Sequence, residues 1–322
     1  MNRDLGLNLA RVTEAAALAS ARFLGKGDKN GADQAAVDAM RRMFDTVNID
    51  GTVVIGEGEI DEAPMLYIGE QIGIGASEAE KVDIAVDPLD GTSAIANGMD
   101  NAIAVVAVAP QGCLLHAPDI YMDKIACGPR AKGCIHLDDS ATENITRVAK
   151  ALGKDVEDMT IAILDRERHD ALVQEIRALG SRIKKVQDGD ILTAIATCFE
   201  ESGVDMMMGI GGAPEGVLAA SALKCLGGDF QGKLMPLDDE QLQRARKLNA
   251  DLEKIFEIDD LVKGNDVLFS ATGVTEGDIL RGVRLMKNNT AKTDTMVLRL
   301  PSGTIRHMTS VHKLDQKPEY AR

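Results

Sequence analysis

The sequence contains no tryptophan, and aromatic residues make up only 3% of its 322 residues. Proteins that bind single-stranded nucleic acid stack the bases on aromatic side chains, so this scarcity argues against that class. Basic residues are also few, with 36 Lys and Arg against 51 Asp and Glu, which leaves a formal net charge of −15. Because phosphate backbones are bound through an excess of positive charge, we expect no nucleic-acid partner.

Cysteine pairs and long apolar runs are missing as well. The five cysteines form no C-x-x-C pair and are odd in number, so we interpret them as reduced thiols and expect a cytoplasmic protein. No run approaches the roughly 18 apolar residues of a membrane span, so we expect no membrane partner. The remaining composition, 45% hydrophobic and 27% charged, is typical of a globular protein. A length of 322 residues favours two domains over one.

The first half of the chain mixes helical and strand patterns without strict alternation. Apolar residues recur at steps of three and four from Leu5 to Phe23, which predicts an amphipathic helix that ends at Gly25 and Gly27. A second helix is predicted over about 32–47. Strand patterns follow over 52–55, 82–86, 102–109 and 113–121.

From about residue 159 the patterns alternate regularly. Strands are predicted over 161–164, 182–186 and 204–208, and helices over 170–179, 191–198 and 214–226. Such alternation is typical of a parallel sheet covered on both faces, so the fold class is α/β with an α+β first half. We therefore predict two domains, 1–157 and 158–322. A long helix over 238–255 is expected next, then strands over 267–271, 295–300 and 304–312, which are free to return to the first domain.

The segment Asp87-Pro88-Leu89-Asp90-Gly91-Thr92 is the most informative in the chain. It sets two carboxylates three residues apart, then a glycine and a hydroxyl, where a strand gives way to a helix. A turn of this kind can hold a divalent metal and offer backbone N–H groups to an anion. Metal and anion together indicate phosphate chemistry.

A second acidic segment, Gly56-Glu57-Gly58-Glu59-Ile60-Asp61-Glu62, also follows a strand directly. Taken alone, it reads as a solvated acidic turn. Beside the first motif it reads as a second set of metal ligands, because hard cations such as Mg2+ and Mn2+ prefer oxygen ligands.

The glycine-rich segment Gly209-Ile210-Gly211-Gly212-Ala213-Pro214-Glu215-Gly216 lies between a predicted strand and a helix. Pro214 suits the first helical position and Glu215 the positive helix end. A tight turn with a dipole-matched acid stays open as the structural interpretation. A dinucleotide fingerprint is disfavoured, because Pro214 replaces its third small residue and the motif comes late in the chain.

Basic residues are concentrated after one strand, in Arg166-Glu167-Arg168-His169. Two arginines at the carboxyl end of a parallel strand can clamp a phosphate, although an ordinary charged first helical turn explains them equally well. Asp188-Gly189-Asp190 ends the next strand at the same edge. The histidines show no metal-ligand spacing, so we treat His169 as structural.

These segments together resemble a known family. Asp87–Thr92 matches the D-P-[IL]-[DE]-G-T signature of the metal-dependent, lithium-sensitive sugar phosphatase superfamily, which includes inositol monophosphatases and fructose-1,6-bisphosphatases. With it, Gly27–Asp33, Val54–Glu59, Ala63–Glu70, Ala117–Met122 and Gly209–Gly216 resemble the bacterial class II fructose-1,6-bisphosphatases, and the resemblance covers nearly the whole chain. It implies a layered α-β-α-β-α sandwich of two domains.

The resemblance also implies roles for individual residues. The implied ligands of two or three Mn2+ or Mg2+ ions are Asp33, Glu57, Asp87, Asp90 and Glu215. Contact with the sugar and its phosphates falls on Asp90, Gly91, Thr92, Tyr121, Arg166, Glu167, Arg168, Asp188, Gly189, Asp190 and Gly212. Catalytic roles fall on Thr92, Glu57 and Asp90. The chain departs from close relatives at Asp90, where Glu is frequent, and at Arg166-Glu167, where Lys-Pro occurs.

The implied activity is hydrolysis of the 1-phosphate of fructose 1,6-bisphosphate in gluconeogenesis, by a homo-oligomer, either a dimer or a tetramer. Two alternatives share the fold: a sedoheptulose-1,7-bisphosphatase and an inositol-phosphate phosphatase. A third alternative is a non-catalytic protein that binds sugar phosphates. Lys29 either adds a positive charge to the site or lies on the surface.

Overall fold

Two β-sheets organise the computed structural model, which describes all residues except 59–63, 77–78 and 322. The described chain divides into two compact units. Unit 1 contains Met1–Leu114 and Gly264–Arg322, and unit 2 contains Leu115–Lys263. Each unit has its own sheet and its own hydrophobic clusters.

The sheet of unit 1 contains eight described strands in the order β12-β13-β11-β4-β3-β1-β2, and β14 also pairs with β13. Of its described pairs, β1 with β3 is parallel, and the others are antiparallel. The strands span Asp50–Ile55 (β1), Gln71–Ile72 (β2), Lys81–Asp90 (β3), Ile103–Pro110 (β4), Leu268–Gly273 (β11), Arg284–Met286 (β12), Thr290–Arg299 (β13) and Thr304–Lys313 (β14).

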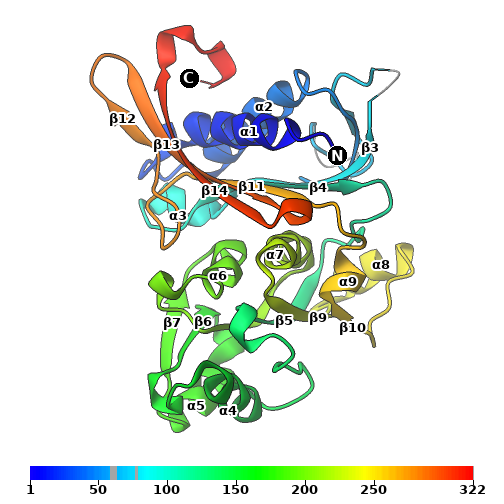
Figure 1. Cartoon of the computed structure of the whole chain (residues 1–322), viewed down its shortest axis with the longest axis vertical. Coiled ribbons are helices and arrows are strands. Elements are labelled where there is room, and N and C mark those ends of the chain that lie inside the picture. Colours follow the sequence, from blue (N-terminus) through cyan, green and yellow to red (C-terminus); the bar gives the residue numbers. More distant parts are fainter. Residues whose placement is uncertain (59–63, 77–78, 322) are drawn as a thin grey trace. The chain divides into compact units, whose positions relative to one another are not determined.

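Helices α1 (Leu5–Ser20) and α2 (Lys29–Phe44) cover one face of this sheet (Figure 1). Apolar residues of both helices share one buried cluster with alternate residues of β3 and β4, which is the pattern of side chains directed to one face of a strand. Helix α2 begins where the Asp28 side chain accepts a hydrogen bond from the backbone N–H of Gly31 at 2.9 Å, a standard N-cap. The short helix α3 (Thr92–Asn97) follows β3.

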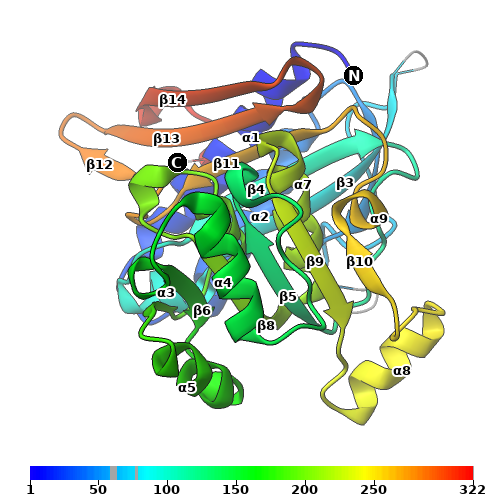
Figure 2. The same ribbon diagram turned by 60° about the horizontal axis from the view of Figure 1, so that its bottom comes forward.

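The sheet of unit 2 has the described order β10-β9-β5-β8-β6-β7. Figure 2 shows β5 beside β9. Strands β6, β7 and β8 are parallel where they pair, whereas β5 runs antiparallel to both β8 and β9. The strands span Tyr121–Cys127 (β5), Thr160–Leu164 (β6), Arg182–Val186 (β7), Met206–Gly212 (β8), Asp229–Leu234 (β9) and Ile255–Glu257 (β10). The carboxyl ends of β6, β7 and β8 therefore share one edge of the sheet.

Helices cover both faces of the unit 2 sheet. Helices α4 (Ala141–Leu152) and α5 (Asp170–Ala178) bury their apolar residues with Ile125, Ile161 and Met206 on one face. Helix α7 (Ala213–Leu226) packs on the other face, where a Cβ at Gly216 would lie 2.8 Å from Met122 Sδ, and α6 (Asp190–Ala196) packs beside it. Helices α8 (Asp239–Lys247) and α9 (Ile258–Leu261) complete the α-helices described here.

Single 3-10 turns connect several of these elements. They span Ala21–Phe23, Pro129–Ala131, Val156–Asp158, Glu167–His169, Glu200–Ser202, Leu300–Ser302, Leu314–Gln316 and Glu319–Ala321. None of the described helices is long and apolar enough to cross a membrane.

The expected α/β class is confirmed, since both sheets carry helices on their faces. The units change at 114/115 and 263/264 rather than near residue 157, because β5 precedes that point and yet pairs with β8 and β9. The last strands do return to the first unit.

Two predicted elements are wrong in extent. The helix expected over 238–255 ends at Lys247, because Asn249 adopts φ 49 and the chain enters β10 at Ile255. The strand expected over 113–121 is absent up to Ile120, and β5 begins at Tyr121, where that prediction ended.

Helix α1 offers a test of the unit 1 core with a matched control. Leu9 is 0% exposed and packs in the cluster between α1, α2 and the sheet, whereas Leu7 on the same helix is 52% exposed. We expect Leu9→Ala to lower the free energy of unfolding by about 2–5 kcal/mol, because it leaves a cavity. Leu7→Ala is expected to change it by less than about 0.5 kcal/mol. Urea denaturation followed by circular dichroism measures both, and equal losses would contradict the packing described.

Candidate active site

A β-bulge brings Asp87 and Asp90 to the same face of β3. Residues three apart on a regular strand lie on opposite faces. Here Asp87 pairs with Val105 and Asp90 with Ile103, so β3 has one residue more than β4 between these two pairs. Since directly paired residues share a face, and Val105 and Ile103 are two apart, both carboxylates lie on one face. The Asp87 carboxylate also accepts a hydrogen bond from the backbone N–H of Leu89 at 3.0 Å.

Gly91 turns the chain from β3 into α3, which begins at Thr92. Its φ of 100° is a left-handed conformation that favours glycine, and a Cβ there would lie 3.0 Å from Cα of Ala102. Thr92 is thus held directly after the two carboxylates.

Glu57 follows the parallel neighbour of β3. Ile55 of β1 pairs with Ala85 of β3, so Glu57 and Asp87 each lie two residues beyond the same paired position. The backbone N–H of Glu57 donates to the carbonyl of Leu66 at 3.0 Å, and a Cβ at Gly56 would lie only 1.9 Å from that carbonyl oxygen. We call Glu57, Asp87 and Asp90 the acidic corner. The other acids of this segment, Glu59, Asp61 and Glu62, lie outside the described residues.

Helix α2 brings Asp33 and Lys29 toward α3. The Lys29 ammonium donates to the Ser93 hydroxyl at 2.5 Å, and Asp33 lies one helical turn further on the same side. Burial raises the pKa of Asp33. Within the described part of the chain, no hydrogen bond or ion pair compensates this half-buried carboxylate, which is the environment expected of a residue that binds a cation.

In unit 2, three loops meet at the carboxyl ends of β6, β7 and β8, as expected from the sequence. Arg166 Nη2 donates to Asp188 Oδ1 at 2.8 Å, which joins the first loop to the second. Arg168 donates to the Ile210 carbonyl at 2.8 Å, and its guanidinium lies 4.7 Å from the centre of the Tyr121 ring. We call residues 166–169, 188–190 and 209–212 the loop rim.

His169 is buried and connects two parts of the loop rim. Its Nδ1 lies 2.7 Å from the Leu164 carbonyl, and its Nε2 accepts from the Ile210 N–H at 2.8 Å. These partners define the neutral tautomer with the proton on Nδ1. Burial lowers the pKa of His169, and Arg168 and Arg166 add to this effect, while the Leu164 carbonyl and Asp123 oppose it. The histidine has the structural role expected from the sequence.

Lys124 is the group that the sequence interpretation missed. It lies on β5, is 1% exposed, forms an ion pair with Asp190, and donates to the Gly212 carbonyl at 2.8 Å. The missed signal is the pair Asp123-Lys124 inside an otherwise apolar strand. Glu215 lies nearby. Burial raises its pKa, the charge of Asp190 adds to this effect, and Lys124 opposes it.

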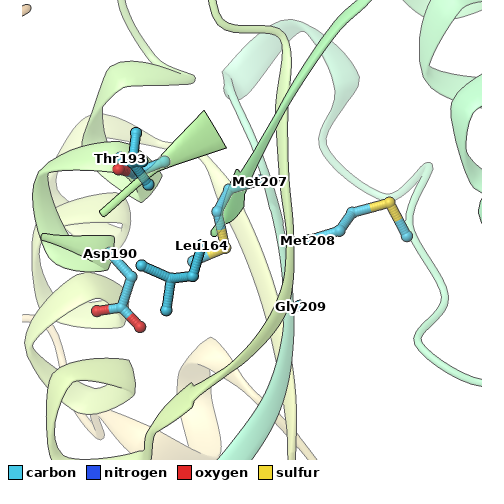
Figure 3. Close-up of a pocket in the computed structure, with 7 residues that line it drawn as sticks. Leu164, Asp190, Thr193, Met207, Met208 and Gly209 are labelled. Carbon is cyan, nitrogen blue, oxygen red and sulfur yellow. The ribbon is translucent and has the colours of Figure 1, made fainter. Parts of the chain in front are cut away.

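The side chain of Glu215 folds back over Gly212, where a Cβ would lie 1.8 Å from Glu215 Oε2. That oxygen is buried and has no hydrogen-bond partner among the residues described. Beneath the loop rim, Asp190 and Thr193 of α6 line a cavity of about 10 Å3 with Leu164, Met207 and Gly209 (Figure 3). It is the size of one water molecule.

The predicted site residues therefore form two groups. Asp33, Glu57, Asp87, Asp90, Gly91 and Thr92 belong to unit 1, whereas Tyr121, Arg166, Glu167, Arg168, Asp188, Gly189, Asp190, Gly212 and Glu215 belong to unit 2. Among the described residues, no group of three or more His, Cys, Asp and Glu side chains has the arrangement of a metal site. Glu167 is exposed in the first turn after Arg166.

The fold and these groups define an α/β protein with carboxylates and arginines at the ends of its strands. Residues 3–312 match the family described as "Bacterial fructose-1,6-bisphosphatase, glpX-encoded". Fructose-1,6-bisphosphatase 1 class 2 of Escherichia coli (strain K12) is 48% identical over 330 residues, covering 98% of this chain and 97% of that protein. Fructose-1,6-bisphosphatase class 2 of Haemophilus influenzae (strain ATCC 51907 / DSM 11121 / KW20 / Rd) is 44% identical over 328 residues, covering 98% of each.

The chain belongs to the bacterial glpX-encoded fructose-1,6-bisphosphatase family. The resemblance drawn from the sequence motifs is thereby confirmed over nearly the whole chain.

The environment of His169 predicts a pH dependence of stability. Because its pKa in the folded protein is lower than the ordinary value of 6.5, the unfolded chain binds more protons as the pH falls below about 6.5. The contribution of His169 is therefore present above that pH and is lost as the pH falls through the folded pKa. We expect the free energy of unfolding to fall less steeply between about pH 7.5 and 5.5 in His169→Gln than in the wild type.

Urea denaturation at a series of pH values measures this slope. The exposed His136→Gln is the matched control, and His312, whose pKa burial also lowers, accounts for part of the slope that remains. A variant slope as steep as that of the wild type would contradict the neutral, buried state of His169.

Proposed function

We propose that this chain hydrolyses the 1-phosphate of D-fructose 1,6-bisphosphate to fructose 6-phosphate and phosphate, as a step of gluconeogenesis. The observation that carries the proposal is the full-length similarity to proteins named fructose-1,6-bisphosphatase, in a chain that keeps the Asp-Pro-Leu-Asp-Gly-Thr corner. A phosphoric monoester hydrolase of this class needs no covalent intermediate with the protein.

Five carboxylates would hold the divalent ions, namely Asp33, Glu57, Asp87, Asp90 and Glu215. Their oxygen atoms are the ligands that Mg2+ and Mn2+ prefer. Two observations support this assignment: Glu215 Oε2 is buried without a hydrogen-bond partner among the described residues, and burial raises the pKa of Asp33. When bound, two or three such ions supply an activated water and neutralise charge on the phosphate.

The chain's own groups would orient the reaction around the acidic corner. The Thr92 hydroxyl orients the attacking water, and an adjacent carboxylate, Glu57 or Asp90, accepts its proton. The backbone amides of Gly91 and Thr92 bind phosphate oxygens directly after Asp90. Lys29, bonded to Ser93, adds a positive charge near α3.

The loop rim would bind the sugar and the 6-phosphate. Arg166 and Arg168 are the cations for the distal phosphate, and each is already oriented, by Asp188 and by Tyr121 with the Ile210 carbonyl. Binding energy at this non-reacting phosphate positions the reacting one. Asp188, Gly189, Asp190 and Gly212 would contact the sugar, and Glu167 is the adjoining loop residue.

The same corner suits other phosphate monoesters, so the alternatives are a sedoheptulose-1,7-bisphosphatase, an inositol-phosphate phosphatase and a non-catalytic binding protein. Phosphate release measured with fructose 1,6-bisphosphate, sedoheptulose 1,7-bisphosphate and inositol monophosphate separates these alternatives. We expect the highest kcat/KM with fructose 1,6-bisphosphate, and comparable rates with inositol monophosphate would overturn the substrate assignment. Assembly into a dimer or a tetramer stays a prediction, for which light scattering is the direct measurement.

Removal of metal or of one ligand tests the mechanism. We expect activity with Mn2+ or Mg2+ to disappear in EDTA and to return when the metal is added back. Asp87→Asn is expected to lower kcat/KM by about a thousandfold or more, because it removes a charged oxygen from the acidic corner.

Asp4→Asn, an exposed carboxylate of unit 1, is the matched control and should keep the wild-type rate. The metal mechanism would be wrong if the enzyme worked undiminished in chelator, or if Asp87→Asn were fully active.

The proposed contact of Arg168 with the 6-phosphate predicts that replacing Arg168 changes KM only for substrates that have this phosphate. Arg168→Gln removes a charge-assisted contact of about 1.5–3 kcal/mol, so we expect KM for fructose 1,6-bisphosphate to rise about 10- to 100-fold. KM for fructose 1-phosphate should change by less than about threefold, since that substrate lacks the 6-phosphate. The exposed Arg246→Gln on α8 is the control. Equal changes in KM for both substrates would show that Arg168 does not bind the distal phosphate.

A further inference from the structure

Lys124 is a charged residue enclosed by unit 2. Its side chain is 1% exposed on β5, a strand whose neighbours β8 and β9 pair with it on both sides. Lysines are almost never so deeply buried unless they are paired. The ammonium has two acceptors, the Asp190 carboxylate on α6 and the Gly212 carbonyl at 2.8 Å at the end of β8. It therefore links β5 to α6, which begins in the loop rim, and to β8, which ends in it.

The glycines of the segment 209–216 leave the space that this side chain occupies. A Cβ at Gly211 would lie 2.1 Å from Asp190 Oδ2 and 2.8 Å from Lys124 Nζ. A Cβ at Gly216 would lie 3.4 Å from Lys124 Cδ. With glycine at these positions, the site has room for the compact ammonium of a lysine and little for the broader guanidinium of an arginine.

Charge explains why a cation is needed at this place. Asp190 is 8% exposed in its side chain, and Glu215 is close enough for the charge of Asp190 to raise its pKa. Two buried carboxylates at close range repel each other, so without a cation they separate or lose their defined positions. Lys124 places a positive charge close enough to act on both and donates to two acceptors at the same time.

We propose that Lys124 is a positioning residue that sets the affinity for the sugar phosphate without touching it. It does so by fixing the Asp190 carboxylate and the Gly212 carbonyl, and this inference rests on the proposed function, in which both residues contact the sugar. An ion pair needed only for folding would make no distinction between substrate affinity and turnover. Replacing a positioning residue raises KM and leaves kcat at saturating substrate nearly intact, because the residue contributes to uniform binding of substrate and transition state.

The test compares Lys124→Met with Lys154→Met. Lys154 forms another lysine–aspartate pair with a buried acid in unit 2, donating to Asp205 at 2.6 Å, and neither residue belongs to the loop rim. We expect Lys124→Met to raise KM for fructose 1,6-bisphosphate at least tenfold, with kcat within about threefold of the wild type. Binding of fructose 6-phosphate, measured by calorimetry with Mn2+ present, should weaken by a similar factor. Lys154→Met should leave KM, kcat and fructose 6-phosphate binding unchanged.

A double-mutant cycle identifies the route. If Lys124 acts through Asp190, the Lys124→Met/Asp190→Asn double variant should have the KM of Asp190→Asn alone. The double variant also removes both charges together, so it retains a folded protein if Lys124→Met by itself does not. Effects on KM that multiply, or a Lys124→Met variant with the KM and the fructose 6-phosphate affinity of the wild type, would overturn the inference.

Metal binding gives an independent readout. Titration of the protein with Mn2+ alone, followed by electron paramagnetic resonance, should show wild-type or tighter affinity in Lys124→Met, since loss of a positive charge does not repel a cation. Weaker Mn2+ binding together with lost kcat would assign Lys124 to metal binding and overturn the positioning role. A wild-type protein that neither hydrolyses fructose 1,6-bisphosphate nor binds fructose 6-phosphate would overturn the proposed function, and this inference with it.

Discussion

Repulsion between buried or partly buried carboxylates is the constraint on which both units of this protein depend. Unit 1 gathers Asp87 and Asp90 on one face of β3, and unit 2 brings Asp190 and Glu215 together beside β8. Each arrangement raises the free energy of the folded chain unless a cation compensates it. In unit 2 the chain provides the cation itself, as Lys124. In unit 1 the proposed divalent ions would add positive charge beside Asp87 and Asp90, so one physical requirement would account for both the lysine and the proposed metal dependence.

Strand ends supply the positions for these charges. In both units a polar segment follows a parallel strand, and backbone hydrogen bonding of the strand determines where the segment begins. The bulge at Asp87–Asp90 then selects the face of the strand, while His169 holds the first loop of the rim to β6 through Leu164 and to β8 through Ile210. The polar side chains of both groups thus lie on secondary-structure elements or on short turns next to the sheets.

Local patterns were enough to predict the parts of the fold that local interactions determine. Helix α1, strand β7 and the alternation of strands and helices from residue 160 to 226 follow hydrophobic periodicity, and most of the predicted site residues lie at or just after strand ends. Helix α4 was missed, although Ser140 and Glu143 form a capping box that can be read from the sequence. The division into units was not predictable in this way, because β5 pairs with residues 79 to 112 positions further along the chain. Lys124 was missed for the same reason: its partner Asp190 is 66 residues away.

The bulge in β3 explains why an aspartate, shorter than a glutamate, suits position 90. An aspartate reaches one methylene less far than a glutamate, and it has fewer torsions to order when it binds a cation. At position 90 the extra residue of the bulge already turns the carboxylate onto the face of Asp87, and the side chain is 7% exposed. A longer acid at this position would have to fold its additional methylene into the same enclosed space. The bulge therefore brings the carboxylate to this face, and in the proposed metal site Asp90 would be an oxygen ligand with little conformational freedom to lose.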